Sequence, residues 1–179
     1  MACSPELLTP RLKMRQFTGA DHDAYAAMCA DEEVMRHIGA GGVLSHDDAW
    51  RSLAGMLGHW ALRGHGQWAL EDRATGTLVG RAGFIEPAGW PGFELGYLLG
   101  RAHWGRGYAL EACRAALDEA WRALGRTHAI SLIRPANARS IGLAERLGAR
   151  QVDRIDFMGG DALVYRHDAP PGARDGRAG

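Results

Sequence analysis

The sequence predicts a mixed α/β fold, with a central, mostly antiparallel twisted sheet of about seven strands flanked by helices. Three strand-like segments follow one another between residues 67 and 100 with only short connections, and consecutive strands joined in this way are antiparallel. Helical segments precede these strands. A helix, a strand, a second helix and a hairpin follow them, so helices are available to cover the sheet.

The first part of the chain is predicted to hold one strand and then helices. Residues 11–17, RLKMRQF, alternate apolar and polar side chains, which is typical of a strand. Residues 20–29 are helical in character, and a short helix follows over DEEVMRHIG. After the flexible stretch GAGG, Ser45 with Asp48 resembles a capping box and predicts the start of a longer helix that ends near RGHG.

The central segments follow in a regular order. QWALED (67–72) and TLVGRAGFIE (77–86) flank the turn sequence RATG and predict a hairpin. A Pro- and Gly-rich loop leads to the strand FELGYLLG (93–100). The helix over 108–124 carries a stripe of small apolar residues, which lets a helix lie close to a sheet.

The last third of the chain predicts a buried strand, a helix and a hairpin. AISLIRP (129–135) is a nearly continuous apolar run, and NARSIGLAERLG (137–148) is a helix closed by glycine. A hairpin around MGGD follows. We expect one domain over residues 5–167, and the polar residues 168–179 to form a disordered tail.

Composition narrows the function. Lys+Arg and Asp+Glu are both 21, so no basic excess indicates nucleic acid or an anionic membrane as a partner. Lys13 is the only lysine, which argues against a lysine nucleophile. Cys3, Cys29 and Cys113 are widely spaced, so neither a metal site nor a disulfide framework is expected. With no signal peptide and no apolar run long enough to span a membrane, we expect a cytoplasmic protein.

The stretch WGRGYALEA (104–112) places two glycines and an arginine where a strand ends and a helix begins. The first N–H groups of a helix lack internal partners, and the helix dipole adds partial positive charge there. Such a segment suits an anion such as a pyrophosphate, although a plain turn is the alternative. The Walker A pattern and the GxGxxG fingerprint are both absent, so any phosphate loop here is of another kind.

Four segments together resemble the GNAT acetyltransferase superfamily, specifically its RimJ/RimL-like N-acetyltransferase branch. They occur in the expected order between about Leu8 and Tyr165. The chain opens with the branch's L-x-T-x-R-L-x-L-R pattern, and the other segments resemble its fourth strand, its acetyl-CoA loop and its N-x-x-S-x-x-L helix. In chain order they are LLTPRLKMRQF, FELGYLLG, WGRGYALEA and NARSIGLAERLGA.

The resemblance implies acetyl-CoA as cofactor, and the cysteine and histidine spacing leads us to expect no metal. The resemblance further implies that the fourth and fifth strands splay apart, often at a bulge, and Gly96 and Gly100 are compatible with one. Asn137 would contact the cofactor, or act as a plain N-cap, or both. Arg106 or Arg139 could meet a phosphate, or be solvated. Backbone groups of Leu98 and Leu99 would pair with the pantetheine arm. The pyrophosphate would be held by the backbone N–H groups of the loop and helix start, at Trp104, Gly105, Arg106, Gly107, Tyr108 and Ala109.

The resemblance also implies direct attack of an amine on the thioester. For the base we favour Glu94, which is otherwise an ordinary carboxylate, with Glu86 as the substitute. A backbone N–H near Leu98 would stabilise the oxyanion. Ala144 stands where many members have the tyrosine that assists the thiolate, so Ser140 is the replacement we favour. Tyr97 and Tyr108 are weaker candidates.

The expected function is an acetyl-CoA-dependent N-acetyltransferase acting on a primary amine, with the N-terminal α-amine of a protein as one acceptor. The alternatives are a small amine (an amino acid, polyamine or aminoglycoside) and a non-catalytic acyl-CoA-binding module. The oligomeric state is open, although the resemblance makes a homodimer an option. Five side chains could reach the acceptor site or be structural: His59, His65, His103, Trp60 and Trp68.

Overall fold

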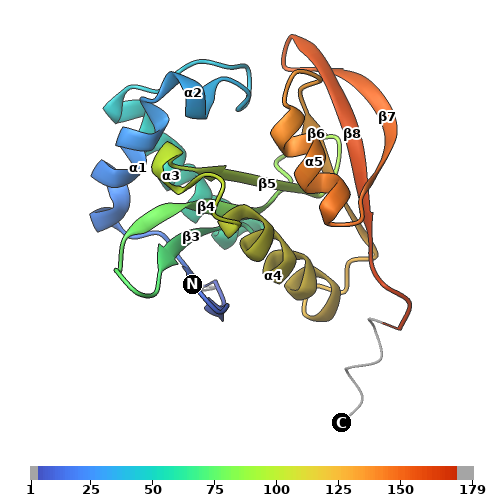
Figure 1. The fold of residues 1–179 in the computed structure, drawn as a ribbon, viewed down its shortest axis with the longest axis horizontal. Helices are drawn as coiled ribbons and strands as arrows, with labels where there is room; N and C mark the ends of the chain where they lie inside the picture. Colours follow the sequence, from blue (N-terminus) through green and yellow to red (C-terminus); the bar gives the residue numbers. More distant parts are fainter. Residues whose placement is uncertain (1–3, 173–179) are drawn as a thin grey trace.

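The computed structural model describes residues 4–172, and one eight-stranded sheet runs through it (Figure 1). The strand order is β1-β2-β3-β4-β5-β6-β8-β7, and all neighbouring pairs are antiparallel except β5 and β6. The predicted fold is confirmed. The strand beyond the expected seven is the two-residue β1. The strands are β1 Leu7–Leu8, β2 Leu12–Arg15, β3 Gln67–Asp72, β4 Leu78–Ile85, β5 Glu94–Leu99, β6 His128–Ile133, β7 Arg150–Phe157 and β8 Gly160–Asp168.

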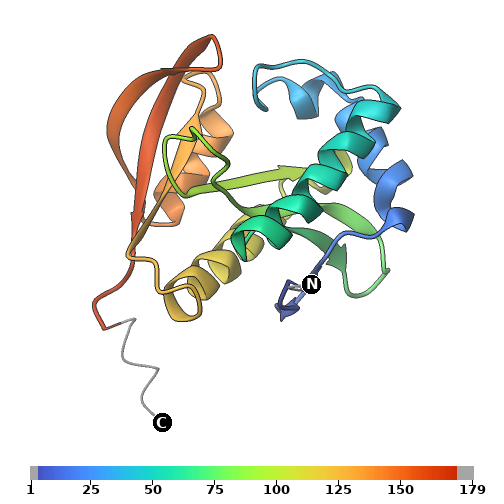
Figure 2. The same cartoon turned by 180° about the vertical axis from the view of Figure 1, so that it is seen from behind.

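Helices cover both faces of the sheet. Helix α4 lies in front of the sheet in Figure 1, and α3 lies in front of it when the molecule is seen from behind in Figure 2. The longer helices begin where the sequence indicates: α3 is capped by the Ser45 side chain and closed by Gly64 in the left-handed conformation. The helices are α1 His22–Cys29, α2 Glu32–Met35, α3 His46–Arg63, α4 Tyr108–Arg122 and α5 Ala138–Arg146, with short 3-10 turns over Gly19–Asp21 and Arg101–His103.

Each face has its own core because strand side chains alternate between the two faces. The α4 face buries Trp68, Phe84 and Leu95 against the small residues of α4, as the stripe predicted. The opposite face buries Ala69 and Leu98 against α1 and α3. Successive residues of β5 therefore point alternately toward α4 and toward the α1 and α3 layer.

The sheet opens between β5 and β6. The β4–β5 ladder continues from Glu94 to Leu99, whereas β5 and β6 share a single pair, Glu94 with Ile130. The Ser131 hydroxyl donates to the Leu95 carbonyl at 3.0 Å just beyond that pair. Residues 96–99 of β5 therefore have no strand neighbour on this side, which is the splay that the resemblance implied.

The bulge expected in β5 is not there. The β4–β5 register runs without a shift past Gly96, and in this half of the sheet the shift lies between Leu70 and Glu71 of β3, opposite Val79. The strands separate because β6 diverges after one pair, and β5 itself stays regular. The prediction fails because a glycine permits a bulge without requiring one.

The C-terminal residues and the lengths of the helices test two of the predictions, the disordered tail and the absence of a membrane span. Strand β8 extends to Asp168, and the Ala169 N–H donates to the Thr127 carbonyl at 2.9 Å, so the first residues of the predicted tail continue the pairing of β8 with β6. The rest of that tail, 173–179, and Cys3 lie outside the described residues. No helix within 4–172 is long and apolar enough to cross a membrane. The assignment of 5–167 to one domain stays a prediction.

Candidate functional site

The loop between β5 and α4 presents a row of free backbone donors. Gly105 and Gly107 have φ of 71° and 80°, and Gly107 caps α4 with no side-chain hydrogen bond. Among the described residues, the N–H groups of 105–110 have no hydrogen-bond partner. The Trp104 N–H instead donates to the Arg101 carbonyl at 3.2 Å, so the row begins one residue later than the sequence predicted. A row of free N–H groups at a helix start is suited to an anion.

Two arginines beside this loop stack on aromatic rings. Arg106 lies 5.4 Å from the centroid of the Tyr108 ring, and Arg139 lies 4.5 Å from that of the Trp104 ring. Neither has a carboxylate partner within the part of the chain that the structure describes. Both charges therefore remain available to a phosphate.

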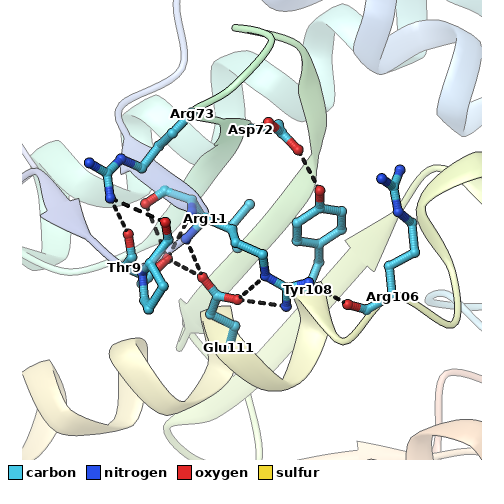
Figure 3. A network of polar contacts seen from close by, with 9 residues as sticks. Thr9, Arg11, Asp72, Arg73, Arg106, Tyr108 and Glu111 are labelled. Carbon is cyan, nitrogen blue, oxygen red and sulfur yellow. Dashed lines mark hydrogen bonds and ion pairs between the residues drawn. The ribbon is translucent and has the colours of Figure 1, made fainter.

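The N-terminal segment fastens this loop (Figure 3). The Arg11 backbone N–H and the Thr9 hydroxyl both donate to Oε1 of Glu111 in the first turn of α4, at 2.8 and 2.6 Å. The Arg11 guanidinium donates to Glu111 Oε2 at 2.7 Å, and its Nη1 donates to the Arg106 carbonyl at 2.7 Å. The Arg11 side chain thus connects the segment before β2 to both the helix and the loop.

A second contact supports the same turn. The Tyr108 ring is buried beneath the Arg11 guanidinium, 4.7 Å from it, and its hydroxyl donates to Asp72 at the end of β3. This bond raises the pKa of the Tyr108 phenol and lowers that of Asp72. The first turn of α4 is therefore held both by the N-terminal segment and by β3. The sequence did not indicate this role for the N-terminal motif LLTPRLKMRQF.

Loss of this fastening should weaken the loop's hold on an anionic cofactor. We expect Arg11→Met to raise the Kd for acetyl-CoA about 10-fold in titration calorimetry, because a loop displaced by a fraction of an ångström no longer aligns its donors. Arg122→Met, at the other end of α4, is the control and should leave the Kd unchanged. Equal Kd values for the two variants would contradict the role of Arg11.

The β4–β5 register decides which backbone groups of β5 face the opening. The Gly100 N–H donates to Val79 at 3.0 Å and the Ile130 N–H donates to Phe93 at 2.9 Å, so alternate residues face opposite edges. By this alternation Tyr97 and Leu99 face the opening, and Leu98 pairs with Arg81 of β4. The Leu99 carbonyl already accepts a bond from the Trp104 indole at 2.8 Å. The expected Leu98 contact is therefore misplaced by one residue.

Glu94 lies on the face of β5 that packs against α1 and α3. It is 9% exposed, and the Trp90 indole donates to its Oε2 at 2.6 Å. Burial raises the pKa of Glu94 to about 7, against the opposing effects of the Trp90 bond, the Leu132 N–H and the Arg81 charge. A carboxyl with this pKa can both accept and release a proton near neutral pH. The substitute, Glu86, is paired with Arg126 at 2.9 Å.

Ser140 has a partner that the sequence did not indicate. The Tyr97 hydroxyl lies 2.7 Å from Ser140 Oγ and joins the opposite face of β5 to α5. Burial raises the pKa of the Tyr97 phenol, so it stays a proton donor. Asn137 accepts the Ser140 N–H at 3.2 Å, the N-cap expected for it, and its amide NH₂ has no hydrogen-bond partner among residues 4–172. Ala144 is buried.

Among the other candidates, Trp60, Trp68 and His59 are held in structural contacts, whereas the buried Nδ1 atoms of His65 and His103 have no hydrogen-bond partner among residues 4–172. Trp60 and Trp68 are buried, and their indoles donate to the backbone carbonyls of Gln67 and Pro5. The His59 ring bridges the His65 carbonyl and the Glu86 N–H. Burial lowers the pKa of His65 to about 4. Cys113 is also buried.

Comparison with known proteins shows which family shares this sequence and fold. Residues 11–150 match the family model described as the acetyltransferase (GNAT) domain. The crystal structure of an acetyltransferase from Agrobacterium tumefaciens is 33% identical, covers 92% of this chain and 95% of that chain, and has a TM-score of 0.82. The family-model match includes the loop after β5, β5 itself and α5.

Two further proteins are similar over a shorter stretch of the chain or at lower sequence identity. The uncharacterized protein YkkB of Bacillus subtilis is 35% identical over 100 residues, which is 55% of this chain and 58% of YkkB. Mycobacterium smegmatis RimJ in complex with CoA-disulfide is 19% identical, covers 88% of this chain and 82% of that chain, and has a TM-score of 0.71. At that identity the resemblance to RimJ is one of fold.

Proposed function

The chain belongs to the GNAT acetyltransferase family, a family of acyltransferases, and from this premise we propose that it transfers an acetyl group from acetyl-CoA to a primary amine. One observation carries the proposal. The free N–H groups of 105–110 lie at the end of the open β5 edge, and Glu94 and the Tyr97–Ser140 pair lie on opposite faces of that strand. An anion-binding loop, a proton acceptor and a proton donor therefore border one opening.

The residues present suit the cofactor. The N–H groups of 105–110 would hold the pyrophosphate, with Arg106 and Arg139 as charged partners. The backbone groups of Tyr97 and Leu99 that face the opening would pair with the pantetheine arm as an added strand. Asn137, whose amide NH₂ has no hydrogen-bond partner among residues 4–172, caps the start of α5 and would be a further contact for the cofactor.

The division of chemical tasks follows from the two faces of β5. Bound acetyl-CoA supplies the thioester, whose acetyl carbon bonds to the acceptor nitrogen as the carbon–sulfur bond breaks. Glu94 takes the proton that the amine loses. The Tyr97–Ser140 pair gives a proton, or a hydrogen bond, to the departing sulfur. The backbone N–H of Tyr97 or Leu99 would stabilise negative charge on the acetyl oxygen.

The donor pair makes a direct prediction. We expect Tyr97→Phe to lower kcat about 100-fold, because the phenol is the buried donor, and Ser140→Ala to lower it less, because the phenol remains. Steady-state kinetics with saturating acetyl-CoA measures both effects. A larger loss in Ser140→Ala would assign the donor to the serine, as the sequence suggested.

The acceptor has two supported classes. The chain shares its fold with RimL, described as a ribosomal L7/L12 α-N-protein acetyltransferase, and this favours a protein N-terminal α-amine, whose pKa of about 8 leaves part of it neutral at pH 7. A small amine is the second class. The presence of both Glu94 and Tyr97–Ser140 argues against a non-catalytic acyl-CoA-binding module. A cytoplasmic location and a homodimer stay predictions.

Titration calorimetry with acetyl-CoA tests the proposal. We expect saturable binding by the wild-type protein, followed by release of free thiol when a panel of primary amines and short peptides is added. A wild-type protein that binds no acetyl-CoA at millimolar concentration would refute the proposal. Binding without thiol release on any amine would support the non-catalytic alternative.

A further inference from the structure

An arginine without a carboxylate partner lies on the face of the sheet that carries Glu94. Arg81 of β4 is half-buried, and its Nε donates to the Tyr25 hydroxyl at 3.2 Å while its Nη1 donates to Gln67 Oε1. No ion pair joins it to any carboxylate of residues 4–172. By contrast, Arg15, also partly buried, is paired with both Asp21 and Glu71. The Nη2 group of Arg81 is therefore available to an external anion.

The amide beside this arginine also lacks a partner. Gln67 is 3% exposed, and its Nε2 has no hydrogen-bond partner. Gln67 Oε1 accepts from Arg81 Nη1. If the amide were turned by 180°, its NH₂ group would face that guanidinium N–H, and two donors would then be in contact. Leaving a buried donor unpaired costs free energy. An acceptor oxygen of a bound molecule would supply the missing hydrogen bond to Gln67 Nε2.

Two glycines let the Gln67 side chain lie directly on the sheet. Gly83 and Gly96 are paired across β4 and β5, so neither strand sends a side chain into this part of the face. A Cβ on Gly96 would lie only 3.0 Å from Gln67 Nε2, which places that amide over the middle of β5. Glu94 is two residues from Gly96 and shares its face. The candidate base and the free donors therefore border the same part of the sheet.

We propose that Arg81 and Gln67 bind a carboxylate of the acceptor, so that the acceptor is an amine that also carries a carboxylate, in the class of amino acids. The inference rests on the proposed function. The acceptor amine is directed to Glu94, and its carboxylate accepts from Arg81 Nη2 and Gln67 Nε2. The same arginine repels polyamines and aminoglycosides, because they are polycations.

The test compares acids with their amides. The wild-type enzyme with acetyl-CoA receives an equimolar mixture of the common amino acids or of the matching amino acid amides, and mass spectrometry identifies the acetylated products. An amide keeps the amine and the side chain and loses only the carboxylate. We expect kcat/KM for the preferred acid to exceed that for its amide about 100-fold, which corresponds to the loss of one or two charge-assisted hydrogen bonds.

Variants separate recognition from folding. Arg81→Met should reduce the acid-to-amide ratio about 100-fold, and Arg81→Lys should retain part of it, since the charge remains. A purely structural role would lower both rates together and leave the ratio unchanged. Arg150→Met, which removes an exposed arginine of β7 paired with Asp168, is the matched control and should keep the wild-type ratio.

The outcomes distinguish the two levels of proposal. Acetylation of amides, polyamines or peptides without acetylation of the free acids would overturn the carboxylate site and leave the acetyltransferase proposal intact. An acid preference that survives Arg81→Met would also overturn it. Absence of acetyl-CoA binding in the calorimetric experiment would remove both proposals.

Discussion

Gly107→Val is expected to weaken acetyl-CoA binding at least 100-fold. Gly107 has φ of 80°, a conformation that a β-branched residue rarely adopts, and a Cβ there would lie 3.3 Å from Arg11 Nη2. The substitution would therefore turn the backbone and displace the arginine that fixes the loop. Losing two aligned N–H bonds to a phosphate corresponds to roughly this factor.

A matched control separates binding from backbone strain. Gly125 follows α4 at its other end with φ of 63°, and a Cβ there would meet no atom within 4 Å. Gly125→Val should lose a similar roughly 1–2 kcal/mol of stability yet bind acetyl-CoA like the wild type. Calorimetry at a temperature where both variants remain folded makes the comparison. If Gly107→Val retained wild-type affinity, the free N–H groups would belong to an ordinary turn.

Sequence reasoning predicted the features that local chemistry determines. The glycines and arginine of 104–109, the Ser45 cap and the two hairpins depend on residues a few positions apart, and all lie where they were expected. The apolar runs also indicated the strands along the chain, and the short connections between residues 67 and 100 indicated the antiparallel pairing of β3, β4 and β5. The loop could be interpreted as a phosphate site for the same reason.

Contacts between distant segments could not be predicted in this way. The Arg11 and Glu111 side chains are 100 residues apart, and no local pattern pairs them. Tyr97 meets Ser140 only because the α4-facing side of β5 lies beside α5. The resemblance assigns the pantetheine contact to both Leu98 and Leu99, and only the strand register shows that Leu98 pairs with β4 while Leu99 faces the opening.

The strand glycines allow close packing between strands and do not form the bulge that was considered at Gly96. A Cβ at Gly80 would lie 2.1 Å from the Leu98 carbonyl, and one at Gly83 would lie 2.4 Å from the Gly66 carbonyl. These residues let β3, β4 and β5 approach closely. Gly96, expected to serve a bulge, instead makes room for the Gln67 amide, which is visible only when three strands are aligned.

The second large effect is expected from Glu94→Gln. We predict that kcat/KM at pH 8 falls about 100- to 1000-fold, because the amide cannot accept the proton of the amine. In the wild-type enzyme the rate should rise with pH through about 7, where burial places the pKa of Glu94. The variant should lose this rise and keep only the one due to the acceptor's own amine. A pH–rate profile of both proteins measures the difference, and a greater loss in Glu86→Gln would transfer the role to that residue.

Stability gives an independent check on the same carboxyl. Burial raises its pKa in the folded state above the ordinary 4.5, so the folded protein favours the protonated form. That contribution to stability is complete below pH 4.5 and is lost as pH rises through about 7. Glu94→Gln, which is neutral at every pH, should therefore become more stable relative to the wild type as pH rises from 5 to 8 in thermal unfolding. A variant that loses activity yet shows no such trend would mean that the pKa of Glu94 is not raised in the folded protein, and the rise of the rate through pH 7 would then belong to another group.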